Sequence, residues 1–166
     1  MRTLVPLNHW TTASWPATMN CMSSTWRKVT YLPVGGLTEV GFADGPLLLM
    51  VSHQGRGVVD LASGELLARD RQESGAWFDA GGRAALGIGP LEGAWIGVCG
   101  LAGGRLPDAT ADGWQARVSG DRVTVSAPGR QPLEVSEGEE MRAFGFSPDG
   151  TAFIIATSPG LAIYRR

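Results

Sequence analysis

The chain has 166 residues and a formal net charge of −2, and this length suffices for one domain with a core of its own. Its hydrophobic fraction of 43% argues against an intrinsically disordered chain, which combines low hydrophobicity with high net charge. The only adjacent basic pairs are Arg27-Lys28 and Arg165-Arg166, so the chain lacks a basic face for phosphates and we expect no nucleic-acid partner.

Residues 1–26 form the first compositional unit, rich in Thr, Ser and Trp. Pro6 and Asn8 interrupt any apolar run there, so the segment has neither the apolar stretch of a secretory signal nor the length of a membrane span. We therefore expect no membrane partner and a cytoplasmic location. We also expect this segment to pack, through its indole rings, on a single all-β domain that comprises residues 27–166.

Short apolar runs separated by glycine-containing turns begin at residue 29 and continue to the end of the chain. The 24 glycines and 10 prolines that punctuate these runs predict a turn-rich all-β fold. A continuous apolar run, as in residues 47–51, is typical of a strand covered on both faces. In chain order, the expected strands are residues 29–34, 37–43, 47–52, 57–61, 65–69, 76–79, 84–88, 95–99, 114–118, 123–127, 131–136, 143–146, 152–157 and 161–164.

These strands fall into four similar antiparallel meanders, whose first turns lie near residues 45, 81, 120 and 150. The last meander has the strongest turn, Ser147-Pro148-Asp149-Gly150, because proline presets φ and glycine accepts a positive φ. A spacing of about 30–40 residues is close to the length of a propeller blade, about 40–45 residues in the WD family.

Two stretches carry a family resemblance. FSPDGTAFIIATSPGLAIY resembles the hairpin of a β-propeller blade of the WD40, TolB-like or YVTN-like kind, and GFADGPLLLMVSHQGRGVVDLASGELL has the same pattern. The clear units are residues 37–69 and 141–164, with two weaker ones between them. The resemblance implies about four propeller-like units in a small or incomplete propeller, with a β-sandwich or an open barrel as alternatives. If the ring closes, residues 29–34 should pair with residues 161–164.

Residues for catalysis or metal binding are few. The chain has two histidines, His9 and His53, and no local cluster supplies the three or four ligands of a zinc site. It also has no G-x-S-x-G motif and no complete dinucleotide or phosphate loop. Cys21 and Cys99 are expected to be buried reduced thiols. We therefore expect no catalytic residue, no metal and no cofactor.

Six tryptophans are many for this length, and we expect some to wedge between sheets and others to anchor an interface. The first hypothesis is a non-catalytic protein-binding module, most concretely a small bacterial immunity or antidote protein that binds and blocks a toxin or effector. The mild acidity favours a basic partner. The residues expected to bind the partner are Trp10, Trp15, His53 and Arg56. The alternatives are an enzyme or small-ligand site at the mouth of a propeller-like fold, and a structural subunit that completes a propeller by oligomerisation.

Overall fold

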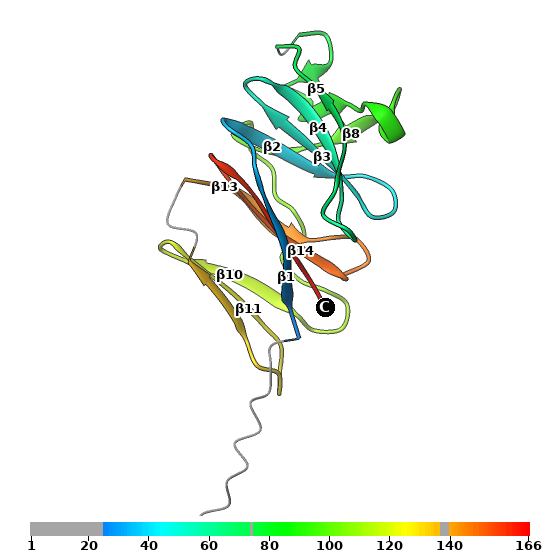
Figure 1. Ribbon diagram of the computed structural model, residues 1–166. Helices are drawn as coiled ribbons and strands as arrows, with labels where there is room; N and C mark the ends of the chain where they lie inside the picture. The colour runs from blue at the N-terminus through cyan, green and yellow to red at the C-terminus, as the bar shows by residue number, and fades with distance from the viewer. Residues whose placement is uncertain (1–24, 74, 137–139) are drawn as a thin grey trace, which may run out of the picture.

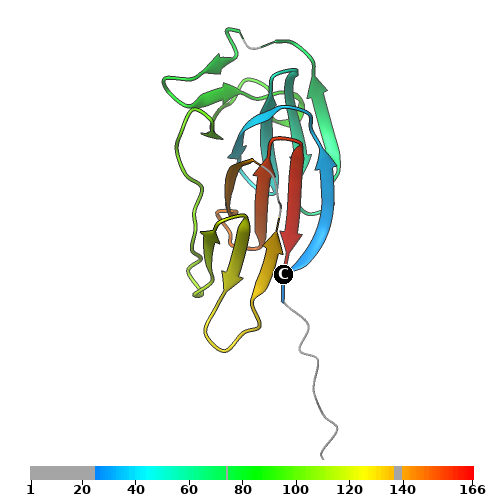
Figure 2. The ribbon, with the colours of Figure 1, turned by 90° about the vertical axis from the view of Figure 1, so that its left-hand side faces the viewer.

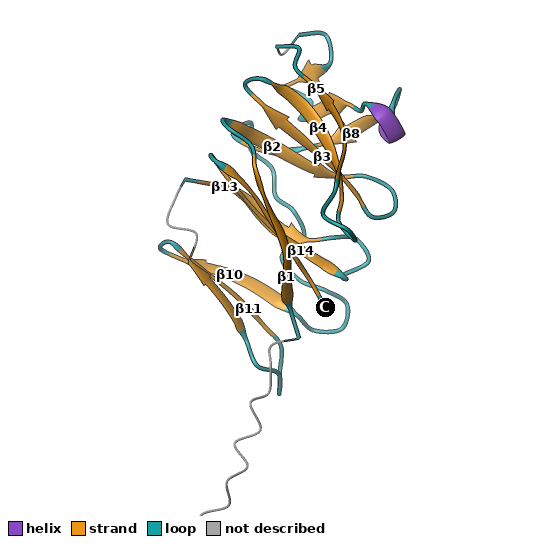
Figure 3. Cartoon of the chain, viewed as in Figure 1, coloured by secondary structure: helices purple, strands orange, loops and turns teal. Residues whose placement is uncertain are grey.

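The computed structural model describes residues 25–73, 75–136 and 140–166 (Figure 1). In this part of the chain the regular elements are strands and one short 3-10 helix, η1 (Gly89–Leu91), so the predicted all-β class is confirmed (Figure 3). The strands are β1 (Arg27–Pro33), β2 (Leu37–Phe42), β3 (Leu47–Ser52), β4 (Gly55–Asp60), β5 (Leu66–Asp70), β6 (Phe78–Asp79), β7 (Ala84–Leu86), β8 (Trp95–Gly97), β9 (Cys99–Gly100), β10 (Gln115–Ser119), β11 (Arg122–Ser126), β12 (Leu133–Ser136), β13 (Met141–Phe146), β14 (Ala152–Thr157) and β15 (Gly160–Arg165).

The strands form four antiparallel sheets, which correspond to the four meanders expected from the sequence. Sheet I has the order β5-β4-β3-β2-β9, and sheet II has the order β6-β7-β8. Sheet III has the order β10-β11-β12, and sheet IV has the order β1-β15-β14-β13. Sheets II and III are therefore built from consecutive strands, whereas sheet I also contains β9 and sheet IV also contains β1, each from a distant part of the chain.

The first and last strands of the described chain share sheet IV. β1 pairs antiparallel with β15, with Tyr31 opposite Ala162 and Leu32 opposite Leu161. The predicted pairing of residues 29–34 with residues 161–164 is thus confirmed. It covers the edge of β15, whose main-chain groups would otherwise be available to another chain.

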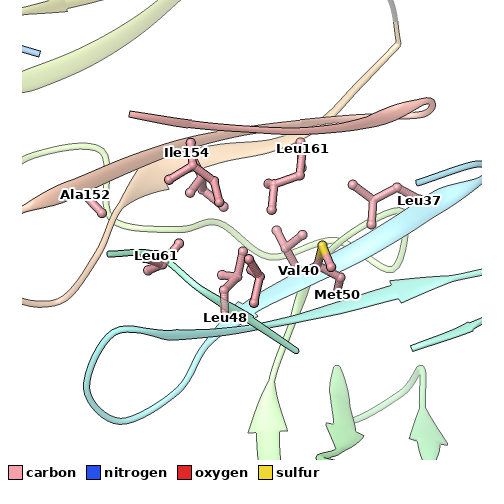
Figure 4. Packing of buried hydrophobic residues seen from close by; sticks show 11 residues of the cluster. Leu37, Val40, Leu48, Met50, Leu61, Ala152, Ile154 and Leu161 are labelled. Atoms are coloured by element: carbon pink, nitrogen blue, oxygen red, sulfur yellow. The ribbon is translucent and has the colours of Figure 1, made fainter. Parts of the chain in front are cut away.

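The four sheets stack face to face in the order III, IV, I, II (Figure 1, Figure 2). A cluster between sheets IV and I includes Leu48, Ile154 and Leu161 (Figure 4). A second cluster lies between sheets III and IV, and a third between sheets I and II. Sheets II and III lie at opposite ends of the stack, so the sheets form an open stack and not a closed ring.

The connection from sheet II to sheet III runs along sheets I and IV. After β9 pairs with β2, the chain crosses to sheet IV, where the Phe146 N–H donates to the Pro107 carbonyl at 2.8 Å. Gly145 allows this approach, because a Cβ there would lie 2.4 Å from the Leu106 Cβ. Residues 99–108 therefore occupy the inner edges of sheets I and IV, the edges that would line the channel of a closed ring.

Sheet III ends the stack with a polar outer face. Val123 and Val125 of β11 point toward sheet IV and are fully buried, whereas the alternate residues Arg122 and Thr124 face away from it. Arg122 forms an exposed ion pair with Glu134 of β12 at 3.5 Å. This face has the composition of a solvated surface, so it does not require another sheet to cover it.

The N-terminal segment is described only at its end. Trp26 is buried between sheets III and IV, where its ring lies 5.6 Å from that of Trp114 in an edge-to-face arrangement. Trp114 and Trp77 are also buried, and they act as the expected wedges between sheets. The predicted packing of the preceding residues lies outside the described part of the chain, and the predicted domain boundary remains a prediction.

Candidate functional site

The structure describes two of the four residues expected to bind a partner. Trp10 and Trp15 lie outside the described residues. His53 is exposed in the turn between β3 and β4, and its backbone N–H donates to the Gly36 carbonyl at 3.1 Å. Arg56 lies three residues further, in β4, but it points elsewhere, so the two residues do not form one site.

Arg56 joins sheets I and II. Its Nε and Nη2 atoms donate to Oδ2 of Asp70 at 3.3 and 3.2 Å, and its Nη1 donates to the Leu86 carbonyl. The guanidinium also lies over the Trp77 ring, 4.7 Å from its centroid, and the side chain is only 9% exposed. These contacts give Arg56 a structural role at the junction of the two sheets, and its role in partner binding remains a prediction.

His53 lies beside a hollow of about 310 Å³ at the junction of sheets I and II, next to the loop that follows β9. This volume is at the lower end of the range for ligand pockets. We call it the Glu39 hollow, after the charged residue that lines it. Its lining residues are Thr38, Glu39, Val51, Ser52, His53, Phe78, Leu101 and Ala102.

Glu39 is the unusual residue of the hollow. It lies in β2 opposite Val51 and Gly100, and it is only 2% exposed. Its Oε1 accepts a hydrogen bond from the Ala102 N–H at 2.8 Å, whereas its Oε2 has no hydrogen-bond partner among the described residues. Burial raises the pKa of Glu39, against the lowering effect of hydrogen bonds from the 101–102 backbone and of the Arg142 charge.

Arg142 is a basic group whose charge acts on Glu39, but its hydrogen bonds go elsewhere. Its Nε donates to the Leu37 carbonyl at 3.1 Å, and its Nη2 donates to Oε2 of Glu140 at 2.9 Å. Arg142 therefore offers Glu39 only a partial, through-space compensation. A buried carboxylate with one unpaired oxygen destabilises the fold, because a full set of hydrogen bonds does not offset the free energy of desolvation.

Cys99 lies beside Glu39 on the neighbouring strand and is a free, buried thiol, as expected from the sequence. Burial, together with the Glu39 charge, raises the pKa of Cys99 to about 11. The thiol is therefore neutral at physiological pH and lacks the thiolate that a nucleophile or a metal ligand needs.

A second hollow, of about 500 Å³, lies between sheets III and IV on the other side of the 99–108 connection. Arg105 and Asp108 contribute charged groups to its wall, and Val118 and Phe144 contribute apolar surface. Between the two hollows Leu101 is 55% exposed, which is high for a leucine. We call this region, from the Glu39 hollow through Leu101 to the second hollow, the connection face.

The described residues contain no group of three or more His, Cys, Asp and Glu side chains that could hold a metal ion. They also contain no helix of the length and apolarity that a membrane crossing requires. The connection face can therefore offer the Glu39 carboxyl, the His53 imidazole, the charged groups of Arg105 and Asp108, and apolar contacts. The residue that sequence reasoning missed is Glu39, whose signal was a carboxylate inside the otherwise uncharged strand LTEVGF.

No protein-family model matches the chain, and no curated protein matches it. The blade-like resemblance of residues 37–69 and 141–164 stays a prediction about architecture and says nothing of activity. The function is inferred from the geometry of the connection face.

Proposed function

We propose that this protein is a non-catalytic protein-binding module and that its partner docks on the connection face. The observation that carries the proposal is the Glu39 carboxylate, buried in a hollow beside the exposed Leu101 with one oxygen unpaired. Proteins tolerate such a violation of local rules mainly at functional sites, where the cost is offset by binding. A carboxyl group whose pKa is perturbed inside a cleft is a site candidate on the same grounds.

A protein partner fits this surface better than a reacting substrate. Leu101 in the connection and Val118 in the wall of the second hollow both expose apolar area, which suits an interface core. General acid–base or nucleophilic catalysis needs at least two chemical groups that act on one point. In the described residues Glu39 forms no hydrogen bond with His53, and the neutral Cys99 thiol does not assist it.

Within this class, we propose an immunity or antidote protein that binds and blocks a toxin or effector in the cytoplasm. The net charge of −2 favours a basic partner through electrostatic steering, which raises the rate of association. The alternative of a small-ligand site is supported by the second hollow, whose 500 Å³ lies within the usual range of ligand pockets. Completion of a ring by oligomerisation is disfavoured at the sheet III end by its polar outer face.

Affinity capture with three versions of the protein tests the proposal. Wild-type protein should retain one stoichiometric partner, and Leu101→Asp should lose it. Leu67→Asp is the matched control, because Leu67 is a similarly exposed leucine (42%) at a bulge beside β4, on the opposite edge of sheet I. Loss of the partner with both variants, or with neither, would contradict docking on the connection face.

A further inference from the structure

We propose that the Glu39 hollow accepts a basic side chain, a lysine or an arginine, from the protein partner, with the carboxyl group of Glu39 as the acceptor at its floor. This inference rests on the proposed function and specifies the chemistry of the partner's anchor residue. It follows from three features of the hollow: its charge, its walls and the absence of an internal counter-ion among the described residues.

The acidic group of the hollow is only partly compensated by the residues around it. Glu39 forms its floor, since it lines the hollow while only 2% of its surface is exposed. Oε1 is held by the Ala102 N–H at 2.8 Å, which fixes the carboxylate and leaves Oε2 without a donor among the described residues. A donor that carries a positive charge gives the strongest hydrogen bond to such an oxygen.

Two arginines near this region are already bound to other acceptors. Arg142 donates to Leu37 and Glu140, and Arg56 donates to Asp70 and Leu86. Neither guanidinium forms an ion pair with Glu39. The described residues contain no ion pair to Glu39, so a cation from the partner would add an interaction that they do not supply.

The walls of the hollow suit a long basic side chain. Phe78 and Leu101 provide apolar surface for the methylene groups, as lysine and arginine stems require. A Phe78 ring also attracts a cation placed over its face. His53, at the opening, provides an imidazole that can hydrogen-bond to the partner's backbone.

Titration of the full chain with n-butylguanidinium, followed by NMR, tests this inference without the partner. The amide signals of Leu101, Ala102 and Phe78 should shift in a saturable manner. Glu39→Gln should bind about tenfold more weakly or worse, as expected when a hydrogen bond to a charged group is lost. The neutral isostere n-butylurea should bind wild-type protein equally poorly. Equal binding of the two probes by wild-type protein, or equal binding of n-butylguanidinium by both proteins, would overturn the inference.

Failure of the basic-anchor inference can be distinguished from failure of the proposed protein-binding function. If n-butylguanidinium binds as expected but no partner is captured, the cation site stands and the protein-binding function is refuted in favour of a small cationic ligand. If a partner is captured through Leu101 but wild-type protein does not discriminate between the two probes, the module stands and the basic anchor is refuted. The butylurea comparison uses wild-type protein alone, so it decides the question even if Glu39→Gln misfolds.

Discussion

Arg56→Ala should destabilise the junction of sheets I and II. The substitution removes the two hydrogen bonds to Asp70, the hydrogen bond to the Leu86 carbonyl and the contact with the Trp77 ring. Hydrogen bonds to charged groups contribute about 1.5–3 kcal/mol each, and a cation–π contact adds about 0.5–2 kcal/mol. Asp70 keeps access to water, which reduces the loss, so we expect a fall in the free energy of unfolding of about 3 kcal/mol.

For a chain of this size, about 3 kcal/mol corresponds to a fall in Tm of about 6–12 °C. Urea titration followed by tryptophan fluorescence measures the stability. Hydrogen exchange should locate the effect, with faster exchange in β6–β8 than in β14 at the centre of the stack. Arg56→Lys is the matched control, because it keeps the charge but loses the planar stacking, and it should lose about half as much stability.

The result also separates two roles for Arg56. If Arg56 only bound the partner, Arg56→Ala would lose partner binding with no change in Tm. The structural role predicts the opposite result: a large fall in Tm, with hydrogen exchange that becomes faster mainly in sheet II. An unchanged Tm, or uniformly faster exchange across β7 and β14, would refute the reasoning from these contacts.

Three further outcomes are expected. Gly145→Ala should lower the unfolding free energy by about 1–3 kcal/mol in urea titrations, because its Cβ would clash with Leu106, whereas Gly129→Ala in an open turn should lose less. Glu39 has a pKa above its ordinary value of 4.5, so its carboxyl stabilises the fold below pH 4.5 and loses this contribution as pH rises through the folded-state pKa. Glu39→Gln should therefore have a higher Tm than wild-type protein at neutral pH, with no advantage in acid; an advantage in acid alone would contradict this sign. Hydrogen bonds from Arg166 hold the pKa of Asp112 at about 2, below its ordinary value of 3.8. Asp112→Asn should therefore lower Tm above pH 3.8. Thermal scans should show that the difference in Tm from wild-type protein shrinks as pH falls toward about 2.

The sequence by itself determined the strands, the turns and the class of fold, because these depend on neighbouring residues. Ser147-Pro148-Asp149-Gly150 forms the predicted turn, with Gly150 at φ +69° and Asp149 accepting from the Thr151 N–H at 3.0 Å. The pairing of β1 with β15 was also predictable, since a meander leaves an unpaired edge that a terminal strand can cover.

Only the tertiary structure decided the openness of the stack and the identity of the site. In the open stack the 99–108 connection pairs along sheets I and IV, and nothing in its composition indicates those distant partners. In the sequence Arg56 is a polar residue near a turn, yet in the structure the Leu86 carbonyl and the Trp77 ring, both from the sheet II side of the junction, contact its guanidinium. In the sequence Glu39 is a single charged residue within a strand. In the structure it is buried because residues 101 and 102 fold over it. Burial depends on which segments meet in space, and for these residues the segments lie far apart in the chain.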